Sequence, residues 1–281
     1  MTRTLAGVDV GTRMTKAVVI DGDGRVEGKA CVFTGHDLAG AARRALDLAL
    51  DSTSGRPATP DYVAATGFGR YQVGFRQAQI TEITCHGRGA VALTPGTRSV
   101  LDVGAMNARA MRVDAGGRVR SFRMNDKCAS GAGRFLERVA KGLEIDLDTI
   151  GSLSLAAKAP QPISSICAVL AESEVINLVT QGHAVEDILA GTHQSIAGRI
   201  VALLRQVGVE PEVALTGGVT KNAGMVRALS ERLGVPVCVH PDAEYAGALG
   251  AALLALGRLR RLESKTVSVS APAPRPARPA R

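Results

Sequence analysis

The 281-residue sequence has no tryptophan, and its other aromatic residues make up only 3% of the chain. Single-stranded nucleic acids stack on aromatic side chains, so this scarcity argues against a nucleic-acid partner. The sequence also has no run of about 18 apolar residues, the length of a membrane-spanning helix. The best candidate, Ala246 to Gly257, is too short, and we expect no membrane association.

A secretion signal is not expected, because charged residues interrupt the first sixteen positions. There is no Cys-x-x-Cys pair, and the five cysteines cannot all pair within one chain, so we expect no disulfide framework and a cytoplasmic protein. Free cysteines are often buried, which predicts core positions for Cys31 and Cys238. The adjacent Cys85 and His86 do not by themselves make a metal site. His193 is predicted to lie on a helix surface or as a satisfied core residue.

The net charge of +8 is concentrated near the C-terminus. From Arg258 to Arg281 seven residues are positive and one is negative, which gives this segment +6 and the other 257 residues about +2. The prolines in the same segment cannot pack into a core, so residues 263–281 are predicted to be a disordered, solvated tail. A docking arm or a nucleic-acid-binding arm is the alternative interpretation.

The rest of the chain contains one pattern of strands and turns twice. Strands are predicted at 4–10, 16–20 and 25–33 and again at 99–103, 108–113 and 118–124. Asp9 precedes the turn residue Asp21 by 12 positions. Asp102 precedes Asp114 by the same interval. We interpret this as an internal duplication, with coincidence between two ordinary β-meanders as the alternative.

Periodic apolar residues predict helices over much of the remaining sequence. The helices cover 38–49, 133–141, 165–179, 189–207 and 245–262, with short buried strands at 212–216 and 235–239. The pattern is that of an α/β protein with two domains. We expect an N-terminal domain at 1–95 and a C-terminal domain at 96–262, followed by the tail.

In each copy of the duplicated unit, the first strand ends at an aspartate in a glycine loop. The first loop reads Asp9-Val10-Gly11-Thr12-Arg13-Met14-Thr15-Lys16, and the second reads Asp102-Val103-Gly104-Ala105-Met106-Asn107. Glycine lets backbone N–H groups approach phosphate oxygens closely, and an aspartate can hold a hydrated Mg²⁺ ion. One such loop is a common hairpin, but two loops facing each other would clamp a triphosphate between two domains.

A third glycine loop, Gly217-Gly218-Val219-Thr220-Lys221-Asn222, follows a predicted strand. Its Gly-Gly turn would expose backbone where a flat base or a ribose could lie. Two Asp-Gly loops followed by a late Gly-Gly loop are the order found in the actin, sugar-kinase and heat-shock-chaperone ATPase superfamily, which the sequence resembles over residues 4–257. The resemblance implies a duplicated two-domain fold with ATP and Mg²⁺ in the cleft between the domains.

Two cysteines lie in segments rich in small residues, each close to the start of a predicted helix. They are Cys128, within 125–137, and Cys167, within 164–174. A helix N-terminus favours the thiolate form. Two thiolates are too few for an iron–sulfur site, which usually takes four, so a second related chain would have to supply the others. On chemistry alone, two inert buried cysteines are the alternative.

Both cysteine segments resemble those of the BadF/BadG/BcrA/BcrD ATPase family. The family includes activators of 2-hydroxyacyl-CoA dehydratases and the ATP-binding subunits of benzoyl-CoA reductase. The resemblance extends to the Asp9 loop and to 66–70, 82–86 and 217–219. It implies that Cys128 and Cys167 are ligands of a [4Fe–4S] cluster shared with a homologous ATP-binding subunit. It also implies acyl-CoA-binding reductase subunits as partners and reduced ferredoxin as the electron donor.

The resemblances imply two groups of nucleotide-site residues. Asp9 and Asp102 would be catalytic. The nucleotide would be bound by Gly11, Thr12, Arg13, Lys16, Gly104, Ala105, Gly217, Gly218, Val219 and Asn222.

The second loop departs from the dehydratase activators, in which it usually reads Asp-Ile-Gly-Gly-Gln-Asp. Here Met106 and Asn107 replace the glutamine and the second aspartate, polar groups that could orient water. This loop resembles that of the delta-type subunit of benzoyl-CoA reductase more closely, which implies an electron-activating subunit. The replacement of the two polar groups leaves open how fast this subunit itself hydrolyses ATP. A homodimeric dehydratase activator is the nearest alternative. A sugar-kinase-like phosphotransferase and a non-enzymatic ATP-responsive regulator are the others.

Overall fold

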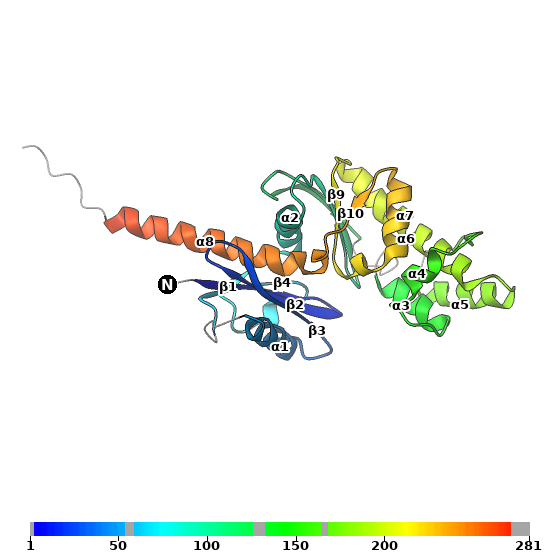
Figure 1. Cartoon of the computed structure of the whole chain (residues 1–281), viewed down its shortest axis with the longest axis horizontal. Helices are drawn as coiled ribbons and strands as arrows, with labels where there is room; N and C mark the ends of the chain where they lie inside the picture. Colours follow the sequence, from blue (N-terminus) through cyan, green and yellow to red (C-terminus); the bar gives the residue numbers. More distant parts are fainter. Residues whose placement is uncertain (1–2, 54–58, 126–132, 164–167, 271–281) are drawn as a thin grey trace, which may run out of the picture.

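The protein is built on two five-stranded sheets (Figure 1). The computed structural model describes residues 3–53, 59–125, 133–163 and 168–270. In spatial order, the first sheet contains β3 (Val26–Phe33), β2 (Met14–Asp21), β1 (Thr4–Val10), β4 (Tyr62–Thr66) and β5 (Ala78–Gln79). The second contains β8 (Val119–Met124), β7 (Ala108–Val113), β6 (Ser99–Val103), β9 (Val213–Thr216) and β10 (Val237–Cys238).

The two sheets repeat one topology. In each, the first three strands along the chain pair as antiparallel hairpins and the last two join in parallel. The turns between the second and third strands of each sheet also match. Asp21 accepts hydrogen bonds from the backbone N–H groups two and four residues later, and Asp114 does the same in the second sheet. The duplication predicted from the spacing of these aspartates is therefore confirmed.

Helices cover both faces of each sheet. They are α1 (Leu38–Asp51), α2 (Glu82–Leu93), α3 (Gly133–Gly142), α4 (Ile150–Ser154), α5 (Ala168–Thr180), α6 (Val185–Val207), α7 (Ala223–Leu233) and α8 (Ala246–Ser270), with single turns η1 (Arg70–Gln72), η3 (Gly218–Lys221) and η4 (Ala243–Tyr245). Across the described ranges, none of these helices combines the length and the apolar composition of a membrane span.

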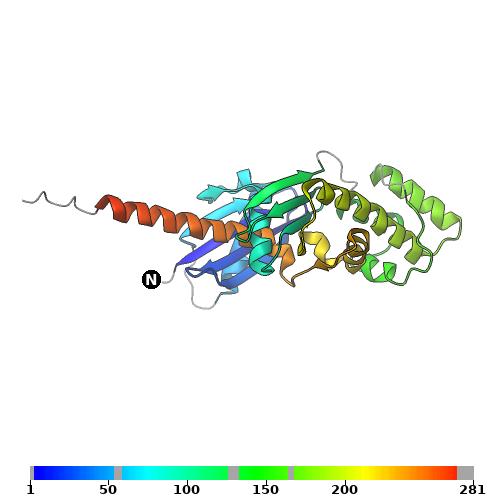
Figure 2. The same cartoon turned by 90° about the horizontal axis from the view of Figure 1, so that it is seen from above.

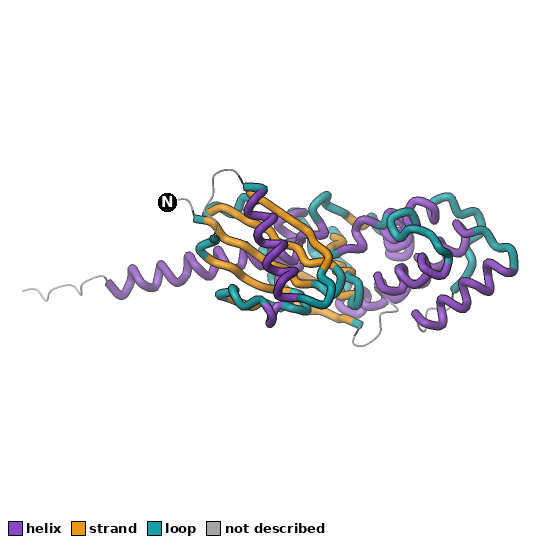
Figure 3. Tube along the Cα trace, turned by 90° about the horizontal axis from the view of Figure 1, so that it is seen from below, coloured by secondary structure: helices purple, strands orange, loops and turns teal. Residues whose placement is uncertain are grey.

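The elements stack as five layers. Helix α1 packs on one face of the first sheet and α8 on the other, as Figures 1 and 3 show. Helix α2 lies against α8 and also covers one face of the second sheet, whose other face packs on α6. Helices α2 and α8 therefore form a layer shared by the two halves. Helices α3, α4 and α5 extend the second half away from the first sheet (Figures 1 and 2).

Helix α8 differs from the prediction in two respects. The division at residue 95 groups this helix with the second domain, whereas it packs on the first sheet and completes that sheet's core. It also continues to Ser270, so residues 263–270 are helical rather than part of a disordered tail. Figure 2 shows its C-terminal part projecting beyond the sheets. Residues 271–281 lie outside the described part of the chain.

Glycines bring the helices of the shared layer close together. A Cβ atom at Gly250 of α8 would lie 1.9 Å from the carbonyl oxygen of Cys85 in α2, a separation that real Cβ contacts essentially never show. A Cβ atom at Gly257 of the same helix would meet no heavy atom within 4 Å. The two positions differ in packing rather than in secondary structure.

Substituting these two glycines is expected to change stability in opposite directions. Gly250→Ala should lower the free energy of unfolding by about 1–3 kcal/mol, because α8 must move away from α2. Gly257→Ala should raise it by up to about 1 kcal/mol, because alanine is the better helix former. Denaturant unfolding of both variants measures these effects. A Gly250→Ala variant with the same free energy of unfolding as the unmodified chain would contradict the close packing of α2 and α8.

Candidate functional site

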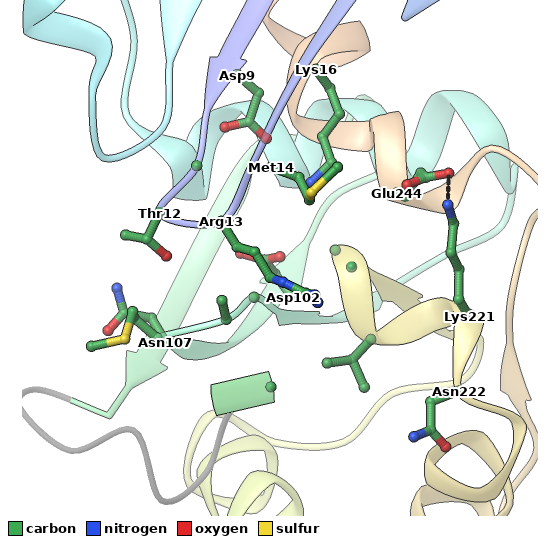
Figure 4. A pocket seen from close by; sticks show the side chains of 18 of the residues that line it. Asp9, Thr12, Arg13, Met14, Lys16, Asp102, Asn107, Lys221, Asn222 and Glu244 are labelled. Carbon is green, nitrogen blue, oxygen red and sulfur yellow. Dashed lines mark ion pairs between the residues drawn. The ribbon is translucent and has the colours of Figure 1, made fainter. Parts of the chain in front are cut away.

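The glycine loops of the two halves open into one cavity of about 500 Å³. The loop after β1 and the loop after β6 lie on opposite sides of it, and η3 contributes a third side (Figure 4). The described residues predicted to bind or act on a nucleotide all line this cavity. They are Asp9, Gly11, Thr12, Arg13, Lys16, Asp102, Gly104, Ala105, Gly217, Gly218, Val219 and Asn222.

Asp9 and Lys16 face each other across the first hairpin. They are paired in the register of β1 and β2, so both side chains project to the same face of the sheet. Both are buried at the edge of the cavity. Burial opposes the charged form of Asp9, but the neighbouring His86 and Lys16 outweigh it and hold the pKa of Asp9 below its usual value. Asp9 is therefore an ionised carboxylate beside the cavity.

Asp102 and Arg109 occupy the matching place in the second hairpin. They are paired in the register of β6 and β7. Unlike Lys16, Arg109 forms ion pairs with two carboxylates: its Nη1 is 2.7 Å from Asp102 Oδ2, and its Nη2 is 2.5 Å from Glu82 Oε2. Burial raises the pKa of Glu82, although the charge of Arg109 acts in the opposite direction. The two halves of the site thus share a backbone plan and differ in their charged contacts.

His86 of α2 lies between the two aspartates, a position that the sequence did not reveal. Its Nε2 is 3.8 Å from Asp9 Oδ2, and its Nδ1 is 3.3 Å from Asp102 Oδ1 and 3.0 Å from Thr216 Oγ1. Burial lowers the pKa of His86, but the negative charges of Asp102 and Asp9 outweigh burial and raise it. The signal that could have found this residue is the family-like stretch at 82–86, which also contains Glu82.

Equivalent Thr-Gly turns support the two aspartates. Gly67 follows β4 and Gly217 follows β9, with φ angles of +88° and +91°. A Cβ atom would lie 2.5 Å from Asp9 Oδ1 at Gly67 and 2.8 Å from Asp102 Oδ1 at Gly217. Only glycine combines the left-handed backbone with this close approach. The duplication therefore extends to the turns behind both carboxylates.

On the η3 side of the cavity, the buried residue His193 forms a hydrogen bond with the cavity-lining Asn222. Asn222 caps α7 by accepting a hydrogen bond from Met225 N, and its Nδ2 donates to His193 Nε2 at 3.1 Å. His193 is fully buried, and its Nδ1 has no hydrogen-bond partner among the described residues. Burial lowers the pKa of His193 to about 4. His193 is thus a neutral core residue that helps to orient the cavity-lining Asn222.

The neutral state of His193 predicts a pH dependence of stability. Between pH 6.5, its ordinary pKa, and pH 4, the unfolded chain binds a proton at this residue and the native chain does not. The free energy of unfolding should therefore fall as the pH drops through this window, by up to ~3 kcal/mol from this group. His193→Gln keeps an acceptor for Asn222 but does not titrate, so it should lack this part of the loss. Denaturant titrations at several pH values measure the free energy of unfolding of both proteins. If this free energy fell equally with pH in the two proteins, a neutral His193 would be contradicted.

The predicted cluster ligands Cys128 and Cys167 lie outside the described residues. The other three cysteines differ in their surroundings. Cys85 is buried in α2, and burial raises its pKa to about 12. Cys31 and Cys238, predicted as core, are only half-buried. Cys31 of β3 helps to line the cavity, which explains why its side chain is only half-buried.

The chain matches the model of a family described as the BadF/BadG/BcrA/BcrD ATPase family over residues 6–255. It is 42% identical to the activator of lactoyl-CoA dehydratase from Anaerotignum propionicum, over 89% of this chain and 96% of the relative. It is 41% identical to one of the subunits of benzoyl-CoA reductase from Thauera aromatica, over 92% of this chain and 94% of the relative.

Solved structures resemble the fold. The activator of 2-hydroxyisocaproyl-CoA dehydratase from Clostridium difficile, with bound ADPNP, superposes with a TM-score of 0.87 and 34% identity, over 94% of this chain and 98% of that one. A glucokinase from Streptomyces griseus gives a TM-score of 0.56 at 14% identity, covering 90% of this chain and 99% of its own, and shares the fold alone. The predicted fold, which groups sugar kinases with related ATPases, is confirmed.

Proposed function

The chain belongs to the BadF/BadG/BcrA/BcrD ATPase family, and from that premise we propose that it is the ATP-binding, iron–sulfur subunit of an ATP-dependent reductase of benzoyl-CoA or a similar aromatic acyl-CoA. The observation that carries this choice is the loop after β6. Met106 and Asn107 line the cavity there, where dehydratase activators usually have Gln and Asp. The similarity to the Thauera aromatica benzoyl-CoA reductase chain over 92% of this protein supports the same choice.

We propose that the cavity holds MgATP. Its volume of about 500 Å³ lies within the range of small-molecule sites, ~300–1,000 Å³. The loops after β1 and β6 would offer backbone N–H groups to the phosphates, and Lys16 would offer a positive charge. Asp9 fits a magnesium ligand because it is an ionised oxygen donor beside the cavity.

The base and ribose would lie on the η3 side of the cavity. Leu136, Leu147 and Val219 contribute apolar surface to the cavity, which suits a flat base. Lys221 and Glu244 form an ion pair at 2.8 Å on the same wall (Figure 4). Asn222, held by His193, would contribute the amide edge.

A [4Fe–4S] cluster, held by Cys128 and Cys167 together with two cysteines of a homologous ATP-binding subunit, would supply a one-electron carrier of low potential. The nucleotide loops contact the helix that begins a few residues after Cys128. Gly133 N and Arg134 N, at the start of α3, donate to Gly104 O and Ala105 O at 2.9 and 2.7 Å. Contacts between ATP and the loop after β6 would therefore be transmitted directly to α3.

The first loop also contacts α3. Arg13 Nε is 3.0 Å from Glu137 Oε1 of α3. A phosphate in the cavity would compete with Glu137 for Arg13, so binding and hydrolysis of ATP would change how firmly α3 is held. Such coupling requires only that ATP and ADP interact differently with this ion pair. The proposed partners are acyl-CoA-binding reductase subunits, with reduced ferredoxin as the electron donor.

A homodimeric activator of a 2-hydroxyacyl-CoA dehydratase is the second candidate. It is favoured by the 42% identity to the lactoyl-CoA dehydratase activator. Both candidates use ATP, and they differ in the chain with which this one assembles.

Identification of the associated chains tests the proposal. The protein would be purified without oxygen from its own host through a tag on this chain, and its complexes analysed by native mass spectrometry. We expect a second, distinct ATPase subunit together with reductase subunits. A homodimer that joins only a dehydratase would replace the reductase function with the activator function.

A further inference from the structure

Asp102 accepts a hydrogen bond from Arg109 and has the His86 ring close to its other oxygen, whereas Asp9 has no counterpart to the Arg109 hydrogen bond among the described residues. Asp102 Oδ2 accepts a hydrogen bond from Arg109 at 2.7 Å, and its Oδ1 lies 3.3 Å from His86 Nδ1. For Asp9, the separation from His86 Nε2 is 3.8 Å, which is beyond hydrogen-bond distance. The two duplicated carboxylates therefore differ in their freedom to interact with a ligand.

The difference arises at one pair of equivalent positions. Lys16 faces Asp9 in the register of the first hairpin, and Arg109 faces Asp102 in that of the second. Lysine carries a point charge on a flexible stem, and Figure 4 shows Lys16 extending towards the cavity. Arginine has a planar fork of donors, and Arg109 uses it to join Asp102 to Glu82. The guanidinium of Arg109 is therefore bonded to two protein carboxylates.

Hydrolysis of ATP needs a base or an orienting group for the attacking water. The water oxygen bonds to the γ-phosphorus, the bond from that phosphorus to the β,γ-bridging oxygen breaks, and ADP leaves with that oxygen. The proton released from water passes to an acceptor near the γ-phosphate and then to solvent. Asp102 could serve as this acceptor, but Arg109 occupies one of the roughly four lone-pair sites of its carboxylate and competes there with the attacking water.

We infer that Arg109 is a positioning residue that engages Asp102, so that this protein hydrolyses bound ATP slowly. The inference rests on the proposed ATP site. Glu82 is a second carboxylate that Arg109 contacts at the same time as Asp102. Arg109 can therefore release Asp102 and remain paired on Glu82, without becoming an isolated buried charge. The Arg109–Asp102 ion pair is thus the element that limits the hydrolytic rate.

A charge-balanced double variant, Glu82→Gln with Arg109→Gln, tests this inference. It removes one positive and one negative charge together and leaves Asp102 with His86 alone. Single-turnover hydrolysis of ATP by the purified full-length chain should become at least tenfold faster, with the Kd for ATP changed less than about threefold. Adding Asp102→Asn to the double variant should abolish the gain, because the gain requires the carboxylate.

The matched control is Arg112→Gln with Glu210→Gln, a half-exposed ion pair between Arg112 on the same strand β7 and Glu210, which precedes β9. It should leave both the rate and the Kd unchanged. If the double variant does not fold, Arg109→Lys keeps the charge and removes the fork, and it should also accelerate hydrolysis.

Slower hydrolysis with retained ATP binding would overturn the inference, because it would make Arg109 a group that stabilises the transition state. A gain that survives Asp102→Asn would overturn it as well. If the unmodified chain does not bind ATP at all, the proposed function fails instead, so the two failures are distinguishable.

Discussion

A chain carrying Cys128→Ala is expected to be purified without iron and to lose ATP-driven electron transfer to its partner. A [4Fe–4S] cluster shared by two chains receives two thiolates from each, so one alanine removes one of four ligands. Cys167→Ala should have the same effect. Iron and acid-labile sulfide analysis, with electron paramagnetic resonance of the reduced protein, measures the loss.

The matched control for these variants is Cys238→Ala. Cys238 lies in β10, is half-buried and does not line the cavity. Its substitution should leave the iron content and ATP binding unchanged. Full iron content in both Cys128→Ala and Cys167→Ala would show that these cysteines are not cluster ligands, and the proposed shared cluster would be wrong.

Asp9→Asn is expected to reduce ATP hydrolysis on the order of 10²-fold or more. The substitution removes an ionised carboxylate beside the cavity, and with it the proposed magnesium ligand and the counter-charge of Lys16. The loss should exceed that of Asp102→Asn in the otherwise unmodified chain, because Asp102 is already engaged by Arg109. Steady-state hydrolysis and magnesium-dependent ATP binding measure both variants.

Asp47→Asn is the control for this prediction. Asp47 lies on the exposed surface of α1, where it pairs weakly with Arg43 at 3.9 Å. Its substitution should leave hydrolysis unchanged. If Asp9→Asn retained the full rate, the nucleotide would have to be bound without this carboxylate, and the proposed arrangement of the cavity would be wrong.

The sequence predicted much of the strand framework, because local signals specify it. An apolar run marked β1 as a buried strand, and turns of aspartate and glycine marked the hairpins that begin at Asp21 and Asp114. The equal spacing of the loop aspartates revealed the duplication, which in turn brought both glycine loops to one cavity. These signals lie within short segments of the chain and need no knowledge of distant contacts.

The shared layer was missed because its signals are not local. Helix α2 contains Gly87 and Gly89, which lower helix propensity, and they are there because α2 packs closely on its neighbours. The apolar pattern of α8 predicts a helix but does not show that it returns to the first sheet.

The contacts of His86 were missed for the same reason. Its hydrogen-bond partner Thr216 is 130 positions away in the sequence. The double ion pair of Arg109 likewise depends on how α2 and β7 meet. These contacts give the site its asymmetry, and no spacing in the sequence predicts them.

The most direct test of the account is the iron and acid-labile sulfide content per chain of protein purified without oxygen from its own host, with the associated chains identified in the same preparation. We predict about two iron atoms for each ATPase chain, in an assembly with a second, distinct ATPase subunit. A folded, ATP-binding protein that contains no iron and has no such partner would contradict it.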